Sequence, residues 1–138
     1  MKDIVNTKIK FREPFRPFAP SVVVEDADKF FLMDNPIDSM PARFMLQVVP
    51  VKSDKRDVVP AISHLGTARL QTVHKETNPR YHQLIRRFGE ATGVPVLLNT
   101  SFNIKGEPIV NTPADALNTF VNSGIDSLVM GDFIVDKP

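Results

Sequence analysis

Apolar residues at helical spacing predict two helices in the second half of the chain. The first covers residues 79–92, and its apolar stripe consists of Tyr81, Leu84, Ile85 and Phe88. Asn78 is suited to cap this helix, with a proline at its first position and Gly93 at its end. The second helix begins after Thr112 and ends at Gly124, with the stripe Leu117, Phe120 and Val121.

Short apolar or alternating runs predict strands between and before these helices. The expected strands are 21–24, 44–49, 68–73, 94–98, 127–130 and 133–135. In 68–73, Arg69 and Gln71 face opposite to Leu70 and Thr72 because side chains alternate along a strand. The order helix, buried strand, helix, strand implies crossover connections, so we expect an α/β fold with an at least partly parallel sheet.

A basic segment near the start also alternates. Lys8, Lys10 and Arg12 flank Ile9 and Phe11 in K-I-K-F-R. In an extended segment the three cations share one face and the two apolar residues bury the other. Like charges gathered in this way favour an anionic ligand, although a solvated edge strand is the alternative interpretation.

Two further segments carry candidate binding groups. The polar cluster Asn99-Thr100-Ser101-Phe102-Asn103 follows the strand 94–98, where ligands gather in open α/β sheets, but an Asn/Ser-rich turn also explains it. The segment Gly66-Thr67-Ala68-Arg69 offers a hydroxyl and a guanidinium that can grip phosphate, or simply a surface strand.

Composition restricts the function. The chain has 138 residues, 42% of them hydrophobic, and 17 basic against 16 acidic side chains give a net charge of +1. No global field therefore recruits nucleic acid, and any anion site must be local. Cysteine is absent, the three histidines do not form a metal spacing, and no run approaches a membrane span. We expect a soluble, cytoplasmic protein that holds no metal and contacts no membrane.

Three blocks together resemble the C-terminal domain of the O-carbamoyltransferases, which include nodulation-factor, cephamycin and tobramycin carbamoylating enzymes. The blocks are V-N-x-K-I-K-F-R-E-P-F-R-P-F-A-P-S, H-x-G-T-A-R-x-Q-T-V and G-V-P-V-L-L-N-T-S-F-N-x-x-G-E-P-I-V-x-T-P-x-D-A. They run in the family's order from Val5 to Ala116. The resemblance implies one YrdC-like domain over residues 1–138, in which helices pack on a twisted mixed sheet with a concave ligand-binding face.

The resemblance also implies an activity and its residues. Such domains form carbamoyladenylate from carbamoyl phosphate and ATP, with Mg²⁺ accompanying ATP, and an actin-like domain in cis or trans then carbamoylates an acceptor hydroxyl. The implied catalytic residues are Lys10, Arg12, Arg69 and Ser101. The implied substrate-binding residues are Lys8, Arg16, Thr67, Asn99 and Asn103. We expect these three stretches to converge in one pocket that neutralises phosphate charge.

Two departures from the family pattern qualify this expectation. Many members carry an extra aspartate before the glycine of this motif, so His64-Leu65-Gly66-Thr67 lacks one acidic contact and one loop residue. The family's preceding G-N-R-S segment and actin-like domain are not in this sequence. We therefore expect weak or no turnover by this chain in isolation. A catalytically incomplete accessory subunit and an RNA-binding YrdC-like module are the alternatives, nucleic acid being disfavoured by the charge. A homodimer is left open.

Overall fold

The structure is a computed structural model that describes all residues, 1–138. The chain divides into two compact units, which we describe separately. The central unit is Pro17–Thr100, and the terminal unit combines Met1–Arg16 with Ser101–Pro138.

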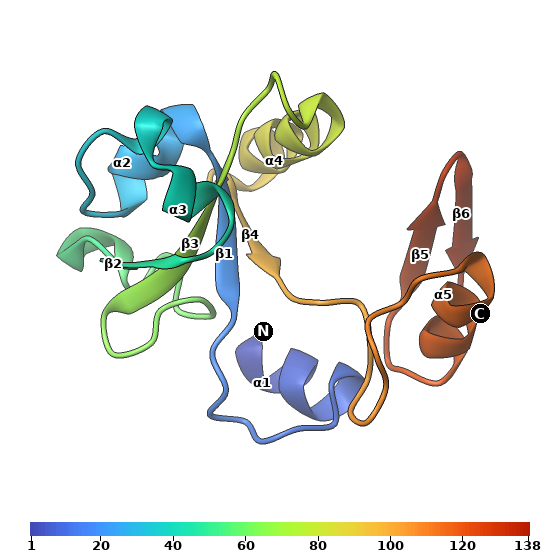
Figure 1. Cartoon of the computed structure of the whole chain (residues 1–138). Helices are drawn as coiled ribbons and strands as arrows, with labels where there is room; N and C mark the ends of the chain where they lie inside the picture. The colour runs from blue at the N-terminus through green and yellow to red at the C-terminus, as the bar shows by residue number, and fades with distance from the viewer. The chain divides into compact units, whose positions relative to one another are not determined.

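The central unit is built on a four-stranded mixed sheet (Figure 1). Its strands, in the spatial order β2-β3-β1-β4, are β2 (Gln47–Pro50), β3 (Thr67–Val73), β1 (Ala19–Val23) and β4 (Val96–Asn99). Strands β1 and β3 run parallel, with Ser21 opposite Gln71, and the other two pairs are antiparallel. The predicted α/β fold with a partly parallel sheet is confirmed.

Helices cover both faces of this sheet. Val22 belongs to the larger core, which includes Phe30, Phe31 and Leu70, and α2 (Ala27–Phe30) lies on this side. The next residue, Val23, points to the opposite face and packs with Val73 and with Ile85 of α4 (Pro79–Thr92). The remaining helices are the short α3 (Met40–Arg43) and single 3₁₀ turns at Val24–Asp26, Pro36–Asp38 and Ser53–Lys55.

Helix α4 matches its predicted bounds because its ends are determined locally. The Asn78 side chain accepts a hydrogen bond from the backbone N–H of Tyr81, Pro79 occupies the first position, and Gly93 adopts φ +78° after the last turn. A left-handed residue at that point favours glycine, which has no Cβ to clash.

The terminal unit has its own small core. Helix α5 (Pro113–Val121) packs against the hairpin of β5 (Ser127–Met130) and β6 (Phe133–Asp136) through Ala116, Phe120 and Leu128. Helix α5 ends at Val121 rather than Gly124. Gly124 instead permits a close approach of the backbone of Lys8, because a Cβ at this position would lie 2.7 Å from the carbonyl oxygen of Lys8. Its backbone N–H donates to that oxygen at 3.0 Å, which ties the start of the chain to the end of α5.

Candidate anion site

The basic segment is helical and then turned, so the predicted alternation of faces is wrong. Helix α1 (Lys2–Ile4) continues as a π-helix over Val5–Ile9. Lys10 is still in the right-handed helical region, and Phe11 then adopts φ +48°. The result inverts the expected burial, since Lys10 is 4% exposed whereas Phe11 is 47% exposed. Side-chain hydrogen bonds beyond the reach of a five-residue pattern explain the difference.

The first of these bonds come from Asn6, which is completely buried. Its amide nitrogen donates to the backbone oxygens of Pro14 and Arg16, at 3.1 and 3.0 Å. Its amide oxygen accepts from Nε of Arg12 at 2.8 Å, and its backbone oxygen accepts from the Arg12 N–H at 2.9 Å. One asparagine therefore satisfies the turned backbone and fixes the Arg12 guanidinium.

Lys10 joins this segment to the polar loop after β4. Its ammonium donates to the backbone oxygens of Ser101 and Asn103, at 2.7 and 2.6 Å. It also lies 2.8 Å from Oδ1 of Asn103 and 3.4 Å from Oγ of Ser101. All four acceptors are uncharged. An ammonium has three N–H donors, so the close acceptors use its full capacity.

Glu107 anchors the same loop to α5. Its carboxylate accepts from Oγ1 of Thr119 at 3.1 Å and from the Ile104 N–H at 3.4 Å, while its backbone oxygen accepts from Nδ2 of Asn103 at 2.9 Å. Asn103 is thus held from both sides, by Lys10 and by Glu107. The sequence reasoning assigned no role to Asn6 or Glu107, although both stand inside the segments that carry the family resemblance.

These contacts frame a pocket of 240 Å³ within the terminal unit. The side chains and backbone that line it come from the turned basic segment and the polar loop: Lys10, Arg12, Glu13, Arg16, Ser101, Asn103, Ile104, Lys105 and Gly106. Four lining residues are cationic and one is anionic. Glu13 pairs with Arg16 at 3.1 Å, in an exposed contact that leaves a net excess of positive charge.

The electrostatics of the lining groups reflect this excess. Burial first, and the neighbouring Arg12 second, hold the pKa of Lys10 below its ordinary value. Burial and then Arg16 lower the pKa of Arg12. The pKa of Glu13 is lowered by a hydrogen bond from its own backbone N–H and then by Arg16. The pocket destabilises its own cations, which is the condition under which a bound anion is favourable.

The arginine strand and Asn99 belong to the central unit. Arg69 is exposed on β3, and Asn99 ends β4. Nδ2 of Asn99 donates to Oε1 of Gln71 at 2.7 Å, and Oγ of Ser21 donates to the same oxygen at 2.6 Å. The predicted alternation in 68–73 is confirmed, since Ala68, Leu70 and Thr72 are buried on the core face.

Thr67 helps close the turn that leads into β3. Its hydroxyl and its backbone N–H both donate to the His64 oxygen, each at 2.9 Å. The two central residues, Leu65 and Gly66, have φ of +51° and +79°. Leu65 is 94% exposed, so its side chain gains little packing energy to offset the unfavourable left-handed backbone conformation.

The structure therefore assembles part of the predicted site. Lys10, Arg12 and Arg16 meet Ser101 and Asn103 in one pocket of the terminal unit. Lys8 is exposed and does not line that pocket. Convergence of the basic pocket with Thr67, Arg69 and Asn99 stays a prediction.

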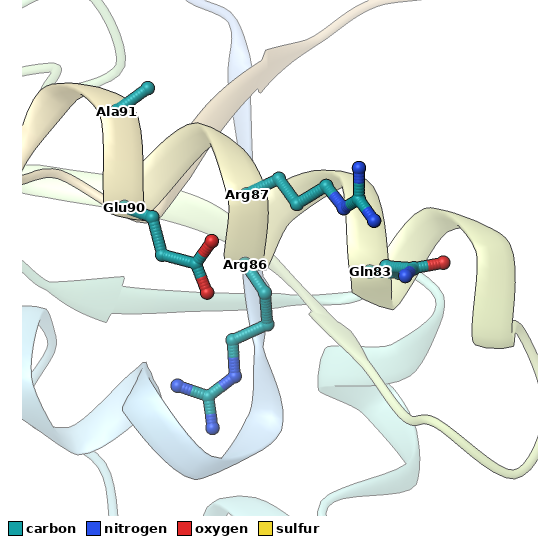
Figure 2. A pocket seen from close by; sticks show the side chains of 5 residues that line it. All are labelled: Gln83, Arg86, Arg87, Glu90 and Ala91. Atoms are coloured by element: carbon teal, nitrogen blue, oxygen red, sulfur yellow. The ribbon is translucent and has the colours of Figure 1, made fainter.

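A larger hollow of 640 Å³ lies over α4 (Figure 2). Figure 2 shows that its walls are the side chains of a single helix, with Arg86 beside Glu90 and Arg87 extending away from Glu90 toward Gln83. Arg86 also contacts Asp26 at 3.2 Å. This surface is open, its charges are mixed, and none of the motif residues line it, so we place the candidate site at the basic pocket instead.

Two observations on the complete structure concern membranes and metal ions. None of its helices combines the length and apolarity needed to traverse a bilayer. No group of three or more histidine, cysteine, aspartate or glutamate side chains is arranged to hold a metal ion.

Comparison with known proteins gives a consistent match. A family model described as carbamoyltransferase C-terminus matches residues 1–137. The chain is 48% identical over 137 residues to nodulation protein NolNO of Sinorhizobium fredii, covering 99% of this chain and 20% of that protein. It is 37% identical over 126 residues to the 3'-hydroxymethylcephem-O-carbamoyltransferase of Amycolatopsis lactamdurans, covering 91% of this chain and 23% of that protein. The chain thus spans about a quarter or less of the length of these relatives.

Proposed function

Because this chain belongs to the carbamoyltransferase C-terminus family, we propose that it binds carbamoyl phosphate and ATP and forms carbamoyladenylate from them. The family and its O-carbamoylating relatives support a transferase. The proposal adds that the chain binds these two ligands, that it forms carbamoyladenylate, and that it does so by itself.

One observation carries this proposal: the buried ammonium of Lys10 has only uncharged partners, in a pocket with three further cations. Taking a cation out of water is costly unless an opposite charge compensates it. Inside the terminal unit, Glu13 is the only anionic residue lining the pocket, and it is paired with Arg16. A phosphate group bound there supplies the missing negative charge.

The size and chemistry of the pocket favour a phosphate group over a whole nucleotide. Its 240 Å³ lies below the range of about 300–1,000 Å³ that is typical for drug-sized ligands. Arg12 and Arg16 are able to grip phosphate oxygens with paired N–H donors. Lys105 adds charge, and Ser101 is an exposed residue of the lining. Lys10 holds the loop and offsets negative charge.

The central unit offers a second set of groups that can bind these ligands. Arg69 is exposed on β3, the Asn99 amide is half-buried at the end of β4, and the Thr67 hydroxyl stands at the entry to β3. Because both reactants are polyanions, catalysis consists mainly of holding them and neutralising their charge. Lys8 is exposed and lies two residues before Lys10 in the sequence. It would add to the positive potential at the basic pocket.

The remainder of the reaction requires groups outside this chain. Mg²⁺ would arrive with ATP. Transfer of the carbamoyl group to an acceptor hydroxyl would fall to an actin-like domain in cis or in trans. The cephem relative is named for O-carbamoylation of a hydroxymethyl group.

Binding calorimetry tests the proposal. Carbamoyl phosphate and ATP, each titrated into the chain at up to millimolar concentration, should bind. Arg16→Glu should weaken, at least tenfold, binding of the ligand whose phosphate occupies the basic pocket, because it replaces a cation at the pocket with an anion. Arg80→Glu is the matched control, since Arg80 is also exposed but lies on α4. Absence of binding by the unsubstituted chain, or equal effects of the two variants, would contradict the proposal.

A further inference from the structure

One part of the central sheet presents polar groups where the rest of that face is apolar. Val23, Val73 and Leu97 on this face pack with Tyr81 and Ile85 of α4. Farther along the same strands, the face holds Ser21 and Gln71, which lie directly opposite one another, and Asn99. Arg69 is two residues from Gln71 on β3 and therefore shares its face.

Gln71 is the centre of this polar group. Its Oε1 accepts hydrogen bonds from both Ser21 and Asn99, at 2.6 and 2.7 Å. Nδ2 of Asn99 also lies 3.6 Å from the Met45 sulfur. These contacts leave Nε2 of Gln71 and Oδ1 of Asn99 without a partner in the protein, and neither is a buried unsatisfied atom. One donor and one acceptor thus remain open on two side chains that are joined by a hydrogen bond.

This complementarity does not depend on how the two amides are oriented. If both were turned, Nε2 of Gln71 would donate to Asn99 and Ser21, and its oxygen would be left open beside the Asn99 nitrogen. One donor and one acceptor are presented in either case. The hydrogen bond between the two side chains links their orientations, so each amide fixes the other.

We propose that Gln71 and Asn99 together recognise the carbamoyl group, with Arg69 taking the attached phosphate, and that Gln71 is the specificity-determining residue of this pair. A carbamoyl group carries a carbonyl oxygen and an NH₂ group side by side, which match an adjacent donor and acceptor. The inference rests on the proposed function, because it assigns carbamoyl phosphate to the central unit.

The spacing on β3 favours carbamoyl phosphate over the adenine ring, whose edge also presents a donor and an acceptor. Residues two apart on a strand are separated by roughly 6 to 7 Å, so Arg69 reaches a phosphate close to the group that Gln71 contacts. In carbamoyl phosphate a single oxygen joins the two groups. In ATP the ribose separates the base from its phosphates, and the distance between them is too long for this pair of residues to contact both.

The experiment compares two phosphonates that differ at one group. Phosphonoacetamide carries the amide NH₂, and acetonylphosphonate has a methyl group in its place. Both are titrated into the full chain while the side-chain amide NMR signals of Gln71 and Asn99 are followed. We expect phosphonoacetamide to bind about tenfold more tightly, the equivalent of one net hydrogen bond. Both amide signals should shift with it, and methylphosphonate should shift them much less.

Gln71→Met removes the amide while keeping the length of the side chain. In this variant the preference for phosphonoacetamide, followed at the Asn99 amide, should fall to within about twofold of unity. Gln47→Met is the matched control, because Gln47 lies on β2 and bonds Ser39 rather than this group. If Gln71→Met does not fold, the titration of the unsubstituted chain decides by itself.

The outcomes separate this inference from the proposed function. Equal binding of the two phosphonates, or a preference that survives Gln71→Met, would overturn the assignment and leave phosphate binding intact. Shifts of both amides with adenosine but not with phosphonoacetamide would also overturn it. If none of the phosphonates binds at millimolar concentration, this inference fails, whereas the proposed function fails only if carbamoyl phosphate and ATP do not bind either.

Discussion

Replacing Lys10 with methionine removes the contact that holds the polar loop in place. Methionine fills a similar volume but donates no hydrogen bond. Two acceptors within 2.8 Å, the backbone oxygens of Ser101 and Asn103, then lose their donor, whereas Oδ1 of Asn103 keeps the hydrogen bond from Oγ of Ser101. Each orphaned acceptor costs about 1 to 2 kcal/mol, and removal of a buried charge returns part of that cost. We expect the loop to lose about 2 to 3 kcal/mol of local stability.

Hydrogen exchange measures this loss where it occurs. The Val110 N–H, which donates to the Phe102 oxygen at 3.0 Å, reports on closure of the loop. A loss of about 2 to 3 kcal/mol corresponds to exchange about 30- to 150-fold faster. Lys8→Met is the control, because Lys8 is exposed, and we expect an effect within about 0.5 kcal/mol. Equal exchange rates in the two variants would refute the view that Lys10 holds the loop.

Three further predictions concern stability. Leu65→Asn should stabilise the chain by about 0.5 to 1 kcal/mol in urea denaturation, because asparagine tolerates the left-handed backbone that leucine now occupies; Leu46→Asn, at another exposed leucine, should not. Gly124→Ala should cost about 1 to 3 kcal/mol, since its Cβ would meet the Lys8 oxygen, and a neutral result in the same assay would contradict that approach. Burial, and then Arg43, lower the pKa of His74, so the unfolded chain binds more protons below the ordinary histidine pKa of about 6.5. Stability should therefore fall as pH drops through that window, and His74→Gln should flatten the fall.

Local signals made the second half of the fold predictable. In α4 the cap, the proline, the apolar stripe and the final glycine all lie within sixteen residues. The residues that determine both ends of the helix and its buried face are therefore local in sequence. The capping box of α5, in which Thr112 and Asp115 bond reciprocally, is similarly local. Its effect extends to the carboxylate, since the hydroxyl and then the backbone N–H of Thr112 lower the pKa of Asp115.

The basic segment was not predictable in the same way. A two-residue alternation over five residues is weak evidence, and a strand was inferred where the chain forms a π-helix and a turn. Contacts 91 and 93 residues away, from Lys10 to Ser101 and Asn103, decide its conformation. Charge placement was nevertheless informative, because these cations and the polar loop do line one pocket.

Amide and carboxylate residues that organise the sites gave no periodic signal. Asn6, Gln71 and Glu107 each connect segments distant in sequence, and no composition or spacing rule identifies such residues. Their presence inside the motif blocks was the available indication. Hydrogen-bond partners, rather than sequence pattern, show what these residues do.

The basic pocket is tested most directly by the ionisation of Lys10. Side-chain NMR follows its pKa, which burial and Arg12 hold below the ordinary value in the free protein. Carbamoyl phosphate or ATP bound in the pocket should raise that pKa, because a nearby anion favours the charged ammonium, and should shift the Lys105 signal as well. Lys10 and Lys105 signals that stay unchanged at millimolar concentrations of both ligands would contradict a phosphate-binding site there.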